Sequence, residues 1–258
     1  MQLFDGDTAI VTGAGNGIGR AIALALVREG VPTLFVDVKP ETVQAAVQDA
    51  AGAAAAAIAW VGDLGDPGER ERLLADAEAA LGKVTMFVHS ASPPRHERDH
   101  LFAVDDATWQ RMHAVNLDAA FHLGRELARR MIARKIPGSM LMLTSLHTDT
   151  PRNLPHYSTA KAAMGMLVKE FAKGLGRYGI RVNAMVPGAI AAGGFVARPE
   201  LVRHIPLGRL GQADDLAPMA LAVLSNRTGG YVTGASIVVD GGLALTNWFE
   251  PANFDEHI

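Results

Sequence analysis

Short apolar runs alternate with helix-like segments along the whole chain. The runs are rich in apolar residues rather than strictly alternating, which is typical of strands covered on both faces. They read TAIVTGAG, PTLFVDV, AIAWVGDL, TMFVHSA, GSMLMLTS, IRVNAMVPG and ASIVVDGG. Between them, helical patterns occupy residues 20–29, 69–81, 106–134, 158–178 and 213–225. This alternation predicts an α/β fold, with a doubly wound parallel sheet of about seven strands flanked by helices.

The chain has no obvious internal boundary. The alanine-rich piece VQAAVQDAAGAAAAAIAW predicts a surface helix that ends near Gly52 and is followed by an edge strand. No linker rich in proline, serine or charge interrupts the pattern, and no fixed-period repeat appears. Residues 1–258 are therefore expected to form a single domain.

The composition of the chain limits the binding partners that we expect. The net charge of −3 gives no overall attraction to nucleic acid or to an anionic membrane. The absence of cysteine excludes disulfides and thiolate metal sites. No apolar stretch is long enough to span a bilayer, and the first residues lack the features of a secretory signal. We expect a soluble cytoplasmic protein without nucleic-acid or membrane partners.

The first candidate site follows the first predicted strand. The stretch IVTGAGNGIG leads from that strand through closely spaced glycines into an amphipathic helix. Glycines permit a tight turn and a close backbone approach, and the helix N-terminus offers unpaired N–H groups to a pyrophosphate. A dinucleotide fits such a turn, although a bare structural turn has the same spelling.

A carboxylate strengthens this interpretation. Asp37 ends the second predicted strand, a little over twenty residues after the glycines, where it is placed to bind ribose hydroxyls. The same carboxylate repels a 2′-phosphate. Lys39 lies nearby, but Asn16 adds no positive charge to the glycine turn. The pattern therefore favours NAD over NADP.

A second candidate site lies in HYSTAKAAM, where Tyr157 and Lys161 are four residues apart. This spacing places both side chains on one face of a helix. A free phenol has a pKa near 10, and a nearby ammonium group lowers it towards the range of a general base. Ser145 ends an apolar strand upstream, and Asn116 lies in the helical segment HAVNLDAAF.

Together these motifs resemble those of the short-chain dehydrogenase/reductase family over nearly the whole chain. The resemblance implies a single-domain Rossmann fold and the catalytic residues Asn116, Ser145, Tyr157 and Lys161. Tyr157 is the implied acid/base, Lys161 lowers its pKa, Ser145 binds the substrate oxygen, and Asn116 supports a proton path.

The family also implies a set of cofactor-binding residues. These are Gly13, Asn16, Gly17, Ile18, Gly19, Asp37, Asp63, Leu64, Ser90, Ala91, Tyr157, Lys161, Pro187, Gly188 and Ile190. The sequence departs from the family at His89-Ser90-Ala91-Ser92, where Asn-Asn-Ala-Gly is usual, and at Ala192, where threonine is common.

The stretch His96-Glu97-Arg98-Asp99-His100 has the H-E-x-x-H spelling of a zinc hydrolase helix. Two prolines precede it and its inner residues are charged, so we predict no metal site there. In the resembling family this loop borders the substrate pocket. The predicted substrate-binding residues are Arg95, His96, Ser145, His147, Arg152, Asn153 and Tyr157, with Arg98 a further candidate. A substrate lid is expected around residues 191–206.

A pocket lined by polar donors suits a hydroxyl-rich molecule. The chain is most similar to bacterial glucose 1-dehydrogenases within the family, which implies oxidation of an aldose at C1 to a lactone. A sharper hypothesis is an anionic sugar, a uronate or a sulfo-sugar, held by Arg95, Arg98 or Arg152. The alternatives are a polyol or secondary-alcohol dehydrogenase, a 3-oxoacyl reductase, and a non-catalytic dinucleotide sensor. Family membership also implies a homotetramer.

Overall fold

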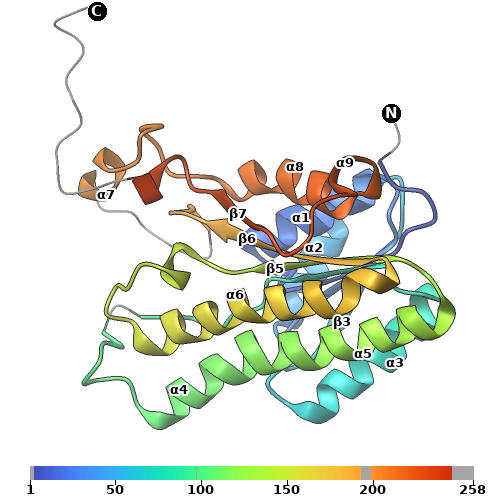
Figure 1. The fold of residues 1–258 in the computed structure, drawn as a ribbon, viewed down its shortest axis with the longest axis horizontal. Coiled ribbons are helices and arrows are strands. Elements are labelled where there is room, and N and C mark those ends of the chain that lie inside the picture. Colours follow the sequence, from blue (N-terminus) through green and yellow to red (C-terminus); the bar gives the residue numbers. More distant parts are fainter. Residues whose placement is uncertain (1–2, 97, 193–198, 246–258) are drawn as a thin grey trace, which may run out of the picture.

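Seven parallel strands form the centre of the protein (Figure 1). The computed structural model describes residues 3–96, 98–192 and 199–245. The sheet order is β3-β2-β1-β4-β5-β6-β7. The strands are β1 (Ala9–Thr12), β2 (Thr33–Asp37), β3 (Ala57–Val61), β4 (Met86–His89), β5 (Gly138–Leu143), β6 (Ile180–Pro187) and β7 (Ser236–Val239). The predicted α/β fold with a doubly wound parallel sheet is confirmed.

Helices cover both faces of the sheet (Figure 1). One face packs against α1 (Gly17–Arg28), α2 (Pro40–Asp49) and α8 (Ala213–Leu224). The other packs against α3 (Pro67–Leu81), α5 (Ala119–Arg134) and α6 (Pro155–Leu175). Shorter helices are α4 (Asp106–His113), α7 (Pro199–Arg203) and α9 (Asn226–Gly229). Because both faces are covered, β1, β4, β5 and β6 are buried along their whole length.

Local sequence signals set several helix ends. Asn16 and Asp66 cap α1 and α3 by accepting hydrogen bonds from backbone N–H groups, and Pro67 opens α3. The alanine-rich piece forms α2 and the edge strand β3, as its pattern predicts. The helical pattern over 106–134 is interrupted: a π-helical turn at Ala114–Asp118 separates α4 from α5.

The strand order reverses direction at β1, which has β2 on one side and β4 on the other. In open parallel sheets this reversal opens a crevice at the carboxyl ends of the strands. Thr12 and His89 face each other there in the register of β1 and β4. The glycine turn and the loop after β4 therefore meet at one edge.

Two further expectations concern the rest of the chain. Among the described residues, no helix is both long and apolar enough to cross a membrane. The expected lid at 191–206 contains α7, but residues 193–198 lie outside the described part of the chain.

Candidate active site

The glycine turn after β1 is shaped by close backbone contacts. Gly13 and Gly17 have φ angles of +66° and +56°. A Cβ on Gly13 would lie 2.9 Å from the Cα of Ala91, and one on Gly19 would lie 2.3 Å from the oxygen of Gly13. Asn16 accepts a hydrogen bond of 2.6 Å from the N–H of Gly17. Gly13 and Gly19 therefore have no room for a side chain, and the turn ends at a helix N-terminus, which suits a pyrophosphate.

Asp37 is held in place beside this turn. Its Oδ2 accepts a hydrogen bond of 3.0 Å from the N–H of Gly15, and its Oδ1 accepts one of 3.1 Å from the N–H of Lys39. A Cβ on Gly15 would lie 2.8 Å from the same carboxylate. Each carboxylate oxygen keeps a lone pair for a further donor, such as a ribose hydroxyl.

Asp63 is paired with Arg111, a residue of α4. The Arg111 Nη1 lies 2.7 Å from the Asp63 Oδ1, which also accepts a 2.8 Å hydrogen bond from the N–H of Gly65. Burial raises the pKa of Asp63, but the hydrogen bonds from Arg111 and Gly65 outweigh it and leave the pKa lowered. A Cβ on Gly65 would lie 2.1 Å from Arg111 Nη1, so glycine there leaves room for the ion pair.

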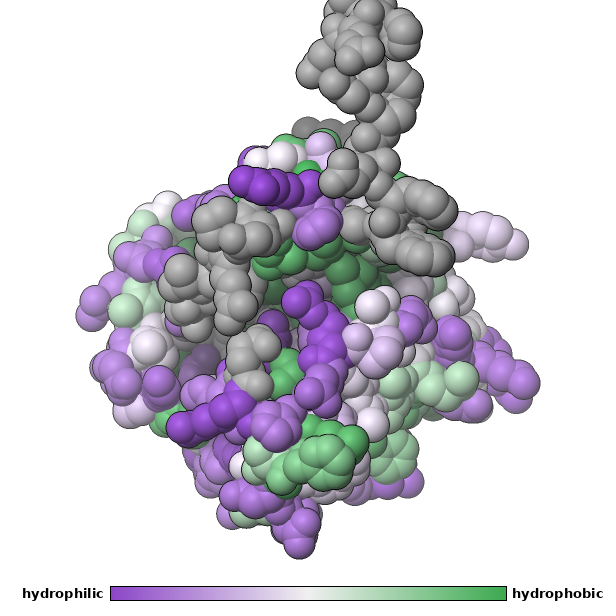
Figure 2. All heavy atoms as spheres, turned by 90° about the vertical axis from the view of Figure 1, so that its left-hand side faces the viewer, coloured by the Kyte–Doolittle hydropathy of each residue, from purple (hydrophilic) through white to green (hydrophobic). Residues whose placement is uncertain are grey.

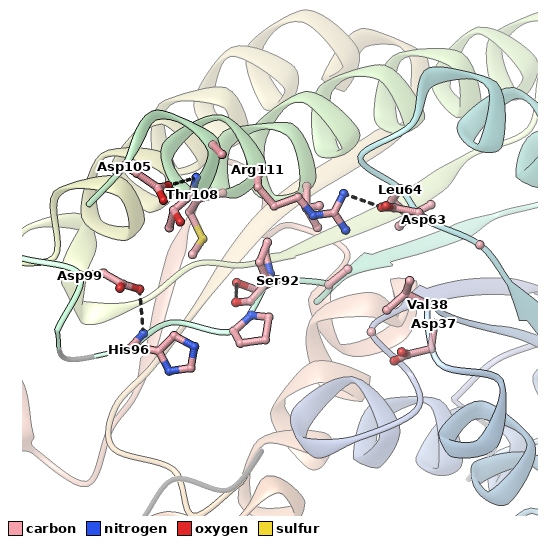
Figure 3. Close-up of a pocket in the computed structure, with 18 of the residues that line it drawn as sticks. Asp37, Val38, Asp63, Leu64, Ser92, His96, Asp99, Asp105, Thr108 and Arg111 are labelled. Atoms are coloured by element: carbon pink, nitrogen blue, oxygen red, sulfur yellow. Dashed lines mark hydrogen bonds and ion pairs between the residues drawn. The ribbon is translucent and has the colours of Figure 1, made fainter. Parts of the chain in front are cut away.

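A cavity of about 810 Å³ connects these groups (Figure 3). Figure 3 shows Asp37 and Val38 facing the Asp63–Arg111 pair at one end, with His96 and Asp99 at the other. Seven of the candidate site residues line it, namely Gly13, Asp37, Asp63, Leu64, Ala91, His96 and Arg98. Figure 2 shows hydrophilic residues gathered around a hollow on this side of the molecule.

Tyr157 and Lys161 lie together near the start of α6, as their spacing predicts. Both are buried, at 6% and 3% exposure, and the Lys161 Nζ is 5.6 Å from the centroid of the Tyr157 ring. Lys161 donates a hydrogen bond of 2.7 Å to the Leu143 oxygen at the end of β5. Burial lowers the pKa of Lys161 to about 7, and the positive charge of Arg95 acts in the same direction. The pair is next to the cavity, because Tyr157 packs with Met112, which lines it.

Asn116 lies within the π-helical turn. Its Nδ2 donates a hydrogen bond of 3.0 Å to the Met112 oxygen, whereas its buried Oδ1 has no partner among the described residues. A buried, unpaired acceptor is a candidate for an ordered water. Ser145 follows β5, is 8% exposed and accepts a hydrogen bond from the N–H of His147.

The residues predicted to bind the substrate differ in how closely they approach Tyr157. Arg95 places its guanidinium carbon 4.4 Å from the Tyr157 ring centroid, and the His147 ring meets that ring edge-on at 5.1 Å. Burial lowers the pKa of His147 to about 4, with contributions from the charges of Arg95 and Arg152. Arg152 and Asn153 are exposed, and Asn153 has a φ of +56°.

The predicted residues at the end of β6 and after it are not among those that line the cavity. Pro187 ends β6, and the N–H of Gly188 bonds to the Val239 oxygen. Ile190 forms a bridge with Gly211. His96 lies in irregular backbone rather than on a helix, and no group of three His, Asp or Glu in the described ranges is arranged to hold a metal ion.

Comparison with known proteins gives the family. The model described as "Enoyl-(Acyl carrier protein) reductase" matches residues 13–244. The chain is 35% identical over 252 residues to galactitol 2-dehydrogenase (L-tagatose-forming) of Cereibacter sphaeroides, covering 93% of this chain and 96% of that protein. It is 34% identical over 256 residues to L-rhamnose 1-dehydrogenase (NAD(P)(+)) of Azotobacter vinelandii, covering 94% and 98%. The chain belongs to the short-chain dehydrogenase/reductase family.

A solved structure agrees with this assignment. The putative NAD(P) dependent gluconate 5-dehydrogenase from Beutenbergia cavernae, with bound NADP at low occupancy, superposes with a TM-score of 0.86 at 29% identity. The comparison covers 95% of this chain and all of that one. This short-chain dehydrogenase/reductase is therefore an oxidoreductase of a family that uses NAD(P).

Two side chains of the site in this short-chain dehydrogenase/reductase were not predicted from the sequence. His89 is fully buried and bridges Thr12 and the Val115 oxygen, at 3.0 Å each. Arg111 pairs with Asp63. The replacement of the family's usual Asn by His89 was a signal for the buried histidine. The spacing of Asp63 and Arg111 in the sequence gives no indication of their ion pair.

Proposed function

We propose that this short-chain dehydrogenase/reductase oxidises a sugar hydroxyl with NAD⁺, with an aldose oxidised at C1 to its lactone as the reaction. The observation that carries the proposal is the buried Lys161, held between the Leu143 oxygen and the Tyr157 ring. An ammonium group in that position favours the phenolate form of Tyr157 and so provides a general base.

Each residue of the set has a role in this reaction. Ser145 binds the sugar hydroxyl, and the Tyr157 phenolate accepts its proton. A bound nicotinamide would supply the acceptor for the hydride of the C1–H bond. The sugar loses two electrons and two hydrogens in total, which leaves the lactone. Lys161 and a water held by the unpaired Oδ1 of Asn116 return the proton from Tyr157 to solvent.

The cofactor preference follows from Asp37. Two backbone N–H groups hold its carboxylate, so it cannot turn away from a 2′-phosphate at low cost. Repulsion between like charges favours NAD over NADP, whereas the ribose hydroxyls of NAD supply the donors that a carboxylate accepts. The relatives named for NAD(P) do not decide this preference.

Two observations favour a sugar as the substrate: the polar side chains around Tyr157 and the named activities of similar proteins. The groups around Tyr157 include Arg95, His147 and Arg152, which suit a molecule rich in hydroxyls. The named activities of the similar proteins include oxidation of galactitol and oxidation of L-rhamnose at C1. The second of these is the reaction type that we propose here.

Two rivals use the same site. A polyol or secondary-alcohol dehydrogenase would give a ketone, and a 3-oxoacyl reductase would act on an acyl thioester, a class suggested by the description of the matching family model. A non-catalytic dinucleotide sensor is a third possibility, against which the buried Tyr157–Lys161 pair argues.

The assembly and location are further proposals. We propose a homotetramer in the cytoplasm. The exposed apolar side chains of Leu101, Phe102 and Trp109, before and within α4, support association with other copies.

The test is a substrate panel with NAD⁺, followed by absorbance of NADH and product analysis. Aldoses, polyols, secondary alcohols and 3-hydroxyacyl thioesters are compared at equal concentration. An aldonolactone from an aldose supports the proposal. Ketones from polyols only, turnover of thioesters only, or no NADH from any substrate would each replace it by the corresponding rival.

A further inference from the structure

The loop after β4 places the guanidinium of Arg95 over the ring of Tyr157, the proposed base. The Arg95 guanidinium carbon is 4.4 Å from the Tyr157 ring centroid. Tyr157 is 6% exposed, whereas Arg95 is an exposed residue. A guanidinium stacked by one face keeps its N–H donors in the plane, free to bind a group beside the ring.

A second arginine approaches from the loop after β5. Arg95 and Arg152 both act on His147, whose ring meets Tyr157 edge-on. His147 itself is neutral near pH 7, because burial, followed by these two charges, lowers its pKa to about 4. Two permanent cations from two different loops therefore act on the surroundings of the Tyr157 ring.

These cations are not neutralised within the described part of the chain. None of the ion pairs formed there includes Arg95 or Arg152. Among the described residues of this loop, Asp99 carries a carboxylate, which lies 3.8 Å from His156 and accepts a hydrogen bond from the N–H of His96. The excess of positive charge beside Tyr157 has to be balanced by a ligand or by solvent ions.

We propose that Arg95 binds the carboxylate of a sugar acid whose hydroxyl is oxidised at Tyr157. The planar fork of a guanidinium matches a carboxylate in a bidentate, charge-assisted pair. The inference rests on the proposed function and narrows its substrate class to a uronic acid, which keeps an oxidisable C1 hydroxyl. Arg95 is then a specificity-determining residue, since a neutral sugar leaves the guanidinium without its anion.

The experiment pairs neutral and acidic sugars that differ only in the carboxylate. Galactose with galacturonate and glucose with glucuronate are oxidised by the wild type, Arg95→Gln and Arg95→Lys at saturating NAD⁺. Arg177→Gln is the matched control, because Arg177 stacks on Tyr178 at 5.2 Å at the other end of α6. We expect Arg95→Gln to lower kcat/KM for the uronate by about 10- to 100-fold, mainly through KM. The loss for the uronate should exceed any loss for the neutral sugar by about tenfold or more, and Arg95→Lys should recover part of this difference.

Equal losses for the neutral and the acidic member of each pair would overturn the inference, and would assign Arg95 to the ionisation of Tyr157 instead. A preference of the wild type for sugar sulfonates or phosphates over carboxylates would overturn it as well. A readout without turnover separates this inference from the proposed function. In the presence of NADH, a uronate should raise the melting temperature of the wild type but not that of Arg95→Gln. That result without oxidation of any sugar would keep Arg95 as the residue that binds the carboxylate and would reject the proposed function.

Discussion

The imidazole of His89 and the hydroxyl of Thr12 are joined by a hydrogen bond of 3.0 Å between the ends of β4 and β1. The hydroxyl also accepts hydrogen bonds from the N–H groups of Ser90 and Ala91. Its one proton therefore goes to Nδ1 of His89, while the Nε2–H donates to the Val115 oxygen. This fixes one neutral tautomer, and it connects the glycine turn to the π-helical turn that carries Asn116.

His89→Asn should make the protein less sensitive to acid. Burial, followed by the charge of Lys161, lowers the pKa of His89 from 6.5 to about 3. The unfolded state therefore binds the extra proton between these values, so the stability that is present above pH 6.5 is lost as the pH falls towards 3. Between pH 7.5 and 5.5 the wild type should lose about 1.4 kcal/mol more than the variant.

Urea unfolding at the two pH values measures this difference. His100→Asn, in the exposed loop before α4, should keep the wild-type dependence on pH. The same pH dependence in His89→Asn and in the wild type would show that His89 is not held neutral.

Tyr157→Phe should abolish most of the turnover while leaving the fold intact. The ring remains to pack against Met112, Leu154 and Ala160, but the acid/base hydroxyl is gone. We expect kcat to fall by at least about 100-fold, with an unchanged circular dichroism spectrum. Near-normal turnover would remove Tyr157 from the mechanism.

Asp37→Ser should relax the cofactor preference. Removal of the carboxylate ends the repulsion of a 2′-phosphate, so the ratio of kcat/KM for NADP⁺ to that for NAD⁺ should rise by about tenfold or more. Asp49→Asn, at the exposed end of α2 where Asp49 pairs with Arg20, serves as the control. If the ratio of kcat/KM for NADP⁺ to that for NAD⁺ is the same in Asp37→Ser and the wild type, another group must recognise the ribose.

Gly65→Ala and Arg111→Gln should have the same effect by different routes. An alanine Cβ would occupy the position of the Arg111 guanidinium, and the glutamine removes the charge. Because both partners are about two-fifths exposed, we expect KM for the dinucleotide to rise by about two- to fivefold with little change in kcat. The double variant should be no worse than either single one, and additive effects would contradict a shared cause.

Local sequence patterns predicted much of the architecture. Buried strands such as GSMLML can only lie in a sheet covered on both faces, so their spacing predicted the parallel sheet. The glycine turn was readable because Gly13 and Gly19 admit no Cβ there. The spacing of Tyr157 and Lys161 was enough to place them on one helical face, because helix geometry is the same in every protein.

The tertiary structure decided which distant groups meet. The His89–Thr12 bond depends on the register of β1 against β4, and the Asp63–Arg111 pair depends on the approach of α4 to the end of β3. The contact of Arg95 with Tyr157 depends on how the loop after β4 packs against α6. Periodicity and turn chemistry act over a few residues, and so they fix elements and local motifs. Contacts between distant segments are set by the packing of the whole chain, which no local pattern in the sequence encodes.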